Sequence, residues 1–228
     1  MSLPLLVLML VVAIAGLVVW SRWRQLARAE FIRTYTFPPG LMERLAKRRP
    51  ELAYKDRHLV SRGLRQFFLA YLKGGRRFVS MPSQVVDDLW HEFILYTRHY
   101  EAFCKQAFGD LLHHTPAAVL STDRRNNTGL RRVWWHACKD ENIDPAKPSR
   151  LPLLFALDAK LGIADGFHYT PDCAALRKNQ HNDGGSVGAY CGGDFSDSSF
   201  DGSTDGFGDA ASGDGGSGGD SSGCGGGD

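Results

Sequence analysis

The sequence predicts an all-α fold in three parts: an N-terminal transmembrane helix, a compact helical domain and a disordered Gly-rich tail. Residues 3–20 form an uncharged apolar run, and residues 183–228 contain 17 glycines and no Lys or Arg. Between them, apolar residues recur at helical spacing with almost no strand-like alternation. We therefore divide the 228 residues into an anchor (1–21), a basic linker helix (22–37), the helical domain (38–182) and the tail (183–228).

The anchor is near the lower length limit for crossing a membrane. Its 18 apolar residues reach about 27 Å as a helix, against a hydrocarbon core of about 30 Å. Trp20 and Trp23 follow at the position of interfacial aromatics, and three arginines come next: Arg22, Arg24 and Arg28. Basic residues that flank a transmembrane helix remain in the cytoplasm. We therefore expect a single-pass protein of the plasma (inner) membrane, with its N-terminus outside and residues 22–228 in the cytoplasm.

A cleaved signal peptide is the alternative interpretation of the same segment. Ala13-Ile14-Ala15 offers a small-residue cleavage site before Gly16. However, no basic side chain precedes the apolar run, and the run continues beyond that site to Trp20. Both features favour an uncleaved anchor.

Charge is divided unevenly along the chain. The residues before Asp183 carry all 27 Lys and Arg and a formal charge of +11, whereas the tail carries nine Asp and a charge of −9. Residues 22–77 hold 15 basic and four acidic residues, a charge that would attract anionic inner-leaflet lipids. The alternative is that these side chains lie on solvated helix faces, and we favour it for most of them. The acidic tail is expected to be dispensable for folding and to contact a protein partner or the basic body. No recognition motif accompanies the basic charge, and we expect no nucleic-acid binding.

The five cysteines do not suggest a disulfide framework. They are odd in number, widely spaced and without a CxxC pair: Cys104, Cys138, Cys173, Cys191 and Cys224. We expect a reducing compartment, with Cys104 and Cys138 as buried thiols in the core.

Five helices are expected in the domain. Pro38-Pro39 opens the first, Asp56 caps the second and Gly74-Gly75 ends it, and Gly109 ends the third. The third is predicted as one long helix that starts near Pro82, with Ser80 as its cap. The expected ranges are 41–48, 56–73, 82–108, 130–142 and 153–161.

One stretch, residues 81–116, is dense in functional residue types. Asp87 and His91 are helix neighbours at i and i+4, and on the wheel of a continuous helix Arg98 lies on the same side. A carboxylate that fixes one imidazole nitrogen leaves the other free to bind a metal or move a proton. After Gly109 the chain can bring His113 and His114 back against the helix. We therefore predict a site for a divalent transition metal made of His91 with His113 or His114, with Asp87 as a ligand or as a residue that orients one.

A purely structural role is the alternative for these residues. Asp87 and His91 would then form a local hydrogen bond, while His113 and His114 would lie at a helix end, where imidazolium is favoured by the dipole. The spacing matches no tight metal motif such as HExxH. The same wheel places Cys104 on the apolar face, away from His91, where a thiol is normally inert.

These residues also carry a family resemblance. The segments VDDLWHEFILYTRHYEAFC and FGDLLHHTP, LRQFFLAYL before them and LPLLFALDAKLGIADGFHY after them resemble the bacterial glycine-rich domain-containing proteins. They are similar, more distantly, to the helical domain of the plant glycine-rich-domain proteins, whose pattern is D-x-x-W-H-x-H. Phe93 stands where that pattern has its second histidine. The resemblance covers roughly residues 35–175 and implies a helical domain without an assigned biochemical function. The positions that match the motif are Asp87, Trp90, His91, Tyr100 and Cys104.

Two functions remain open from the sequence alone. The first is a membrane-anchored helical interaction module, and the second is a metal-binding or metal-dependent catalytic domain that uses His91 with His113 or His114. The sequence assigns no reaction and no catalytic residue to either.

Overall fold

The computed structural model describes residues 3–114, 128–171 and 190–195, and this part of the chain is mostly helical, as predicted. Its elements in chain order are α1 (Leu3–Thr34), α2 (Leu41–Arg48), α3 (Tyr54–Lys73), α4 (Gln84–Ile94), α5 (Thr97–Ala107), α6 (Thr128–Asp140), α7 (Leu153–Leu161), β1 (Tyr169–Thr170), β2 (Tyr190–Cys191) and the 3₁₀ helix η3 (Gly192–Phe195).

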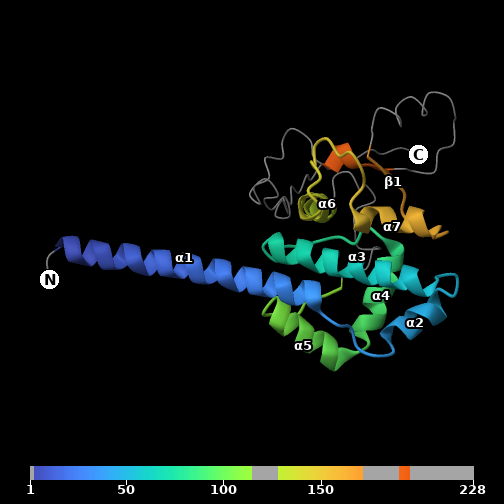
Figure 1. Ribbon diagram of the computed structural model, residues 1–228, viewed down its shortest axis with the longest axis horizontal. Helices are drawn as coiled ribbons and strands as arrows, with labels where there is room; N and C mark the ends of the chain where they lie inside the picture. Colours follow the sequence, from blue (N-terminus) through green and yellow to red (C-terminus); the bar gives the residue numbers. More distant parts are fainter. Residues whose placement is uncertain (1–2, 115–127, 172–189, 196–228) are drawn as a thin grey trace, which may run out of the picture.

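Helix α1 projects from the rest of the molecule for most of its length (Figure 1). Residues 4–27 are exposed, whereas Ala29 and Ile32 near its end are buried in the core. Among the described residues it is the one helix long and apolar enough to cross a membrane. A single helix therefore supplies both an exposed apolar stretch and part of the core of the domain.

Helix α3 lies at the centre of the domain and contacts α1, α2, α4, α6 and α7 (Figure 1). Its Leu64, Phe67 and Phe68 are fully buried. Gly63 permits a close approach of α7, since a Cβ atom at this position would come within 2.4 Å of a Leu157 methyl group. The predicted stop at Gly74 is confirmed, whereas α3 starts at Tyr54, with Asp56 inside its first turn.

The prediction of one long helix over residues 82–108 is wrong. The chain forms α4 and α5 instead, with a break at Leu95 and Tyr96, and Ser83 rather than Ser80 caps α4 by accepting a hydrogen bond from the Val86 amide. The break turns α5 so that Tyr100 and Phe103 both pack on Phe93, with ring centroids 5.3 and 5.6 Å apart. A wheel drawn through both helices is therefore invalid, and it gives no information on the position of Arg98 relative to Asp87.

The predicted disorder of the whole tail is wrong for residues 190–195. Strand β2 pairs in parallel with β1, with Tyr169 opposite Tyr190 and Thr170 opposite Cys191. Phe195 is fully buried, and its ring centroid lies 5.7 Å from that of Trp134. The remainder of the predicted tail lies outside the described residues.

The cysteine prediction is partly wrong. Cys104 and Cys138 are buried free thiols, as expected, but Cys191 is disulfide-bonded. Cys173 and Cys224 lie outside the described residues. The reason is local: pairing of β2 with β1 holds the Cys191 backbone against the domain, an arrangement that cysteine spacing does not reveal.

Candidate metal centre

The first turn of α4 is fixed by a buried carboxylate from α7. Asp158 is 1% exposed, and it accepts hydrogen bonds from the Ser83 hydroxyl and from the Gln84 and Val85 amides at 2.7, 2.7 and 3.2 Å. These amides are among the helix N-terminal donors that have no partner within their own helix. A negative charge is also favoured at this end of the helix dipole. The start of α4, and with it Asp87, is thereby held against α7.

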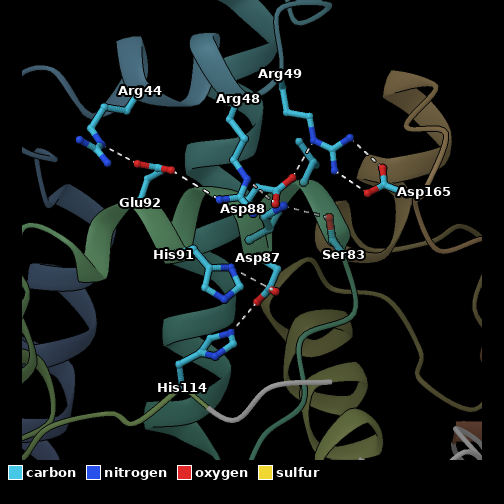
Figure 2. A network of polar contacts seen from close by, with 12 residues as sticks. Arg44, Arg48, Arg49, Ser83, Asp87, Asp88, His91, Glu92, His114 and Asp165 are labelled. Atoms are coloured by element: carbon cyan, nitrogen blue, oxygen red, sulfur yellow. Dashed lines mark hydrogen bonds and ion pairs between the residues drawn. The ribbon is translucent and has the colours of Figure 1, made fainter. Parts of the chain in front are cut away.

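Two arginines of α2, and Arg49 directly after this helix, bind the other acidic side chains of α4 (Figure 2). Arg48 and Arg49 bind the Asp88 carboxylate at 2.9 and 2.6 Å, and Arg44 binds Glu92 at 2.5 Å. Arg49 also reaches Asp165, at 2.7 Å. Asp88 and Glu92 are therefore neutralised within this network, and Asp87 is the α4 carboxylate that faces the histidines.

Asp87, His91 and His114 come together on one side of α4 (Figure 2). One Asp87 oxygen lies 2.9 Å from His114 Nε2 and the other 3.5 Å from His91 Nδ1. The centroids of the two imidazole rings are 4.2 Å apart. One potential ligand atom from each of the three residues lies within 4.8 Å of the others. All three side chains are partly buried.

One nitrogen of this cluster lacks a hydrogen bond. His91 Nδ1 is buried without a hydrogen-bond partner, since 3.5 Å is too long for a good bond to the Asp87 carboxylate. A buried polar atom without a partner costs about 1–3 kcal/mol. The arrangement therefore leaves a nitrogen lone pair or N–H group beside a carboxylate and a second imidazole.

Two aromatic side chains hold the segment that carries His114. The Tyr100 hydroxyl donates to the Leu112 carbonyl oxygen at 2.5 Å and accepts a hydrogen bond from Trp90 Nε1 at 3.1 Å. The Trp90 ring also packs edge-on against His114, with centroids 4.6 Å apart. Burial raises the pKa of Tyr100, so its hydroxyl stays protonated and can serve as this donor.

The remaining predicted residues do not join the cluster. His113 is exposed and, together with His114, lines a cavity of about 460 Å³. Arg98 is exposed on α5. Cys104 is fully buried, and burial raises the pKa of its thiol, as expected for an inert core cysteine. Of the five motif positions, Asp87 and His91 form the cluster with His114, while Trp90 and Tyr100 position the segment that bears His114.

Two features of the site escaped the sequence analysis. The arginines of residues 44–49 looked like solvated or lipid-facing charges, yet they pair with Asp88 and Glu92 of α4. The sequence did contain a signal for these pairs, since Asp88 and Glu92 lie at i and i+4, one position after Asp87 and His91, and therefore share one face of the helix. Asp158 gave no such signal, because its partners at the start of α4, the Ser83 hydroxyl and two backbone amides, lie more than 70 residues away in the sequence.

Residues 27–195 match the UCP032817-like family. The chain belongs to this family. No curated protein and no solved structure matches the chain. The match ends at the buried Phe195, so it includes the β2 and η3 segment that composition alone assigned to the tail. Membership of the UCP032817-like family names no ligand or reaction, and the functional argument therefore rests on the geometry of the site.

Proposed function

We propose that the domain binds a divalent transition metal ion through Asp87, His91 and His114. The observation that carries the proposal is the convergence of two imidazoles and one carboxylate around a His91 nitrogen that has no hydrogen-bond partner. Imidazole and carboxylate are ligands that Zn²⁺ and Fe²⁺ share. Bound metal would take the free His91 Nδ1 and replace the contact between His114 and Asp87.

Three protein ligands leave at least one coordination position open. Structural zinc sites usually have four protein ligands, whereas catalytic sites have three and keep a position for water or substrate. The set of two histidines and one carboxylate is also that of non-haem Fe²⁺ oxygenases. The proposed centre is therefore suited to an exchangeable ligand rather than to a purely structural ion.

The proposal includes a membrane anchor. The apolar first part of α1 makes no buried contact with the domain, whereas Ala29 and Ile32 of the same helix are in the core. Such a helix would hold the metal centre at a fixed distance from the bilayer. The arginines that follow Trp20 favour the cytoplasmic side for the domain.

The likeness to the glycine-rich domain-containing proteins is part of the same proposal. It is supported by the roles of the motif residues, since Asp87 and His91 are proposed ligands and Trp90 and Tyr100 hold the loop of His114. Phe93 packs in the aromatic core in place of the second histidine of the plant motif. His114 would supply the imidazole that this replacement removes.

An interaction module without a metal is the second candidate function. The observation in its favour is the 2.9 Å contact between His114 Nε2 and Asp87, which satisfies both groups without an ion. This candidate predicts that the cluster only fastens the loop at residues 108–114 to α4.

Elemental analysis of the full-length chain separates the two candidates. The protein would be purified in a neutral detergent without a histidine tag, and its zinc, iron and copper would be measured. We expect close to one metal ion per chain, and its loss in His91→Ala. The matched control is His99→Ala, because His99 is an exposed histidine on α5 outside the cluster. A folded wild-type protein that contains no metal and takes up neither Zn²⁺ nor Fe²⁺ would exclude the metal proposal.

A further inference from the structure

A second cavity, of about 650 Å³, lies where side chains of α1, α3, α6 and α7 meet. It shares no lining residue with the proposed metal centre. Part of its wall is apolar, from Leu69, Leu151 and Leu153. Five basic side chains and two acidic ones also line it: Arg33, Arg62, Arg65, Arg150, Lys160, Asp140 and Glu141.

Both acidic side chains are already engaged. Asp140 binds Lys73 at 2.6 Å and Arg33 at 3.0 Å. Glu141 binds Arg150 and accepts hydrogen bonds from the Gln66 amide and the Leu153 N–H at 2.8 and 2.6 Å. Burial acts to raise the pKa of each carboxyl, but these partners outweigh it and hold both pKa values below their usual range. Neither carboxylate is left to neutralise the remaining cations.

Three cations of the cavity have no carboxylate partner in the described part of the chain. Arg65 donates to the Tyr35 carbonyl oxygen at 2.9 and 3.1 Å, a neutral acceptor. Arg62 and Lys160 make no hydrogen bond or ion pair within residues 3–114, 128–171 and 190–195. Burial lowers the pKa of Arg65, and the nearby charge of Arg62 lowers it further. The cavity thus concentrates positive charge that the described residues do not balance.

We propose that this cavity binds a phosphate group of a small organic molecule, through Arg62, Arg65 and Lys160. Guanidinium groups match phosphate oxygens in a two-pronged geometry, and three cations exceed the charge of about −2 on a phosphate monoester. The apolar wall suits an organic portion attached to the phosphate. The site is independent of the metal centre and of the proposed function.

The phosphate has two possible sources, a soluble phosphate ester or a lipid headgroup. Arg33, which lines the cavity, follows Trp20 by 13 residues on a continuous helix, a distance of about 20 Å along its axis. The headgroup layer on each side of a bilayer is only about 5–8 Å thick. This distance favours the soluble ester, and the experiment below distinguishes the two sources.

The test is a titration of the full-length protein with inorganic pyrophosphate, in which calorimetry measures the heat of binding at constant ionic strength. In nanodiscs of phosphatidylcholine, we expect saturable binding that weakens at least tenfold in Arg62→Gln/Lys160→Gln. Lys55→Gln/Arg98→Gln removes the same charge from exposed residues outside the cavity and should change the affinity less than twofold. Because Arg62 and Lys160 are exposed and have no partner among the described residues, the test variant should also keep the wild-type melting temperature.

Absence of saturable binding by the wild type would overturn the proposal, as would equal losses in the two double variants. Repeating the titration in nanodiscs with phosphatidylglycerol identifies the source of the phosphate. Unchanged pyrophosphate affinity there supports a soluble ester. Weaker affinity, from competition by the lipid, supports the same site with a headgroup as its occupant.

Discussion

Tyr100 is the residue that connects the aromatic core to the proposed metal centre. Replacement by Phe removes the hydroxyl that donates to the Leu112 carbonyl oxygen and accepts from Trp90. Buried groups that lose a partner cost about 1–3 kcal/mol each, so Tyr100→Phe should lower the unfolding free energy by this amount. It should also weaken Zn²⁺ binding about tenfold, because the segment that carries His114 loses a fixed position.

Tyr54→Phe is the matched control, since Tyr54 is 68% exposed and its hydroxyl makes no hydrogen bond within the described residues. Denaturant titration and Zn²⁺ calorimetry measure the two effects. Zn²⁺ affinity equal to that of the wild type in a destabilised Tyr100→Phe would show that the hydroxyl stabilises the core without positioning His114.

His136 on α6 should make the stability of the domain dependent on pH. Burial, together with the charges of Lys73 and Arg132, lowers its pKa to about 4, whereas the unfolded chain has a histidine pKa of about 6.5. Between these values the unfolded state binds the proton and the folded state does not, so stability decreases as the pH falls from about 6.5 towards 4. We expect a loss of about 1–3 kcal/mol across this window.

His136→Gln should reduce the slope of unfolding free energy against pH, as measured by denaturant titration at pH 7, 6 and 5. His58→Gln, on the exposed side of α3, is the control that leaves the slope unchanged. The same slope in wild type and His136→Gln would assign the pH dependence to other groups.

At the level of elements, the sequence predicted which segments are helical better than it predicted where each helix begins and ends. The range 153–161 is confirmed as α7 and the stop of α3 at Gly74 is confirmed, because Gly ends a helix through local backbone geometry. The break between α4 and α5 has no Gly or Pro to mark it. It arises because Tyr100 and Phe103 gain contacts with Phe93, which is a tertiary effect that helical periodicity cannot contain.

In the proposed metal centre, too, the local features could be predicted from the sequence and the tertiary ones could not. The i, i+4 spacing of Asp87 and His91 could be predicted because it is local. The choice of His114 over His113 depends on the hydrogen bond from Tyr100 to Leu112, and therefore on the break before α5. Sequence reasoning could reach the pair of neighbouring histidines but not the member that turns towards Asp87.

In the segment from Tyr190 to Phe195, Gly192 is required for a structural reason. A Cβ atom at Gly192 would lie 2.4 Å from the Trp134 ring, so only glycine permits this contact. Deletion of residues 183–228 should therefore destabilise the domain, contrary to the expectation from composition. Loss of the buried Phe195 ring alone should cost about 3 kcal/mol.

Thermal unfolding of two truncations tests this prediction. A chain that ends at Phe195 keeps β2, η3 and the buried Phe195 ring and should melt close to the wild type, whereas a chain that ends at Asn182 should melt several degrees lower. Phe195→Ala in the full-length chain should resemble the shorter truncation, and Phe78→Ala, at a half-exposed position, should not. Equal melting temperatures for both truncations would mean that β2 and η3 add no stability.

For the whole molecule, two observations give opposite expectations about the side of the membrane on which the proposed anchor places the domain. The arginines after Trp20 favour a cytoplasmic domain. The disulfide at Cys191 favours an oxidising compartment, since cytoplasmic thiols are normally kept reduced. Basic residues within about 15–20 residues of a transmembrane segment set its orientation during insertion, before any disulfide can form. We therefore expect the domain in the cytoplasm.

This orientation predicts that the Cys191 thiol is reduced in growing cells and forms its disulfide only after lysis in air. Cells would be quenched in acid and their free thiols blocked with a heavy maleimide, and the peptide containing Cys191 would be examined by mass spectrometry. Air-oxidised lysate supplies the comparison, and buried Cys104 and Cys138 should remain unpaired in both samples. Replacement of Arg22, Arg24 and Arg28 by Gln should give a mixed orientation and a partly oxidised Cys191. Full oxidation of Cys191 in quenched wild-type cells, together with activity of a C-terminal reporter that works only outside the cytoplasm, would reverse the proposed orientation.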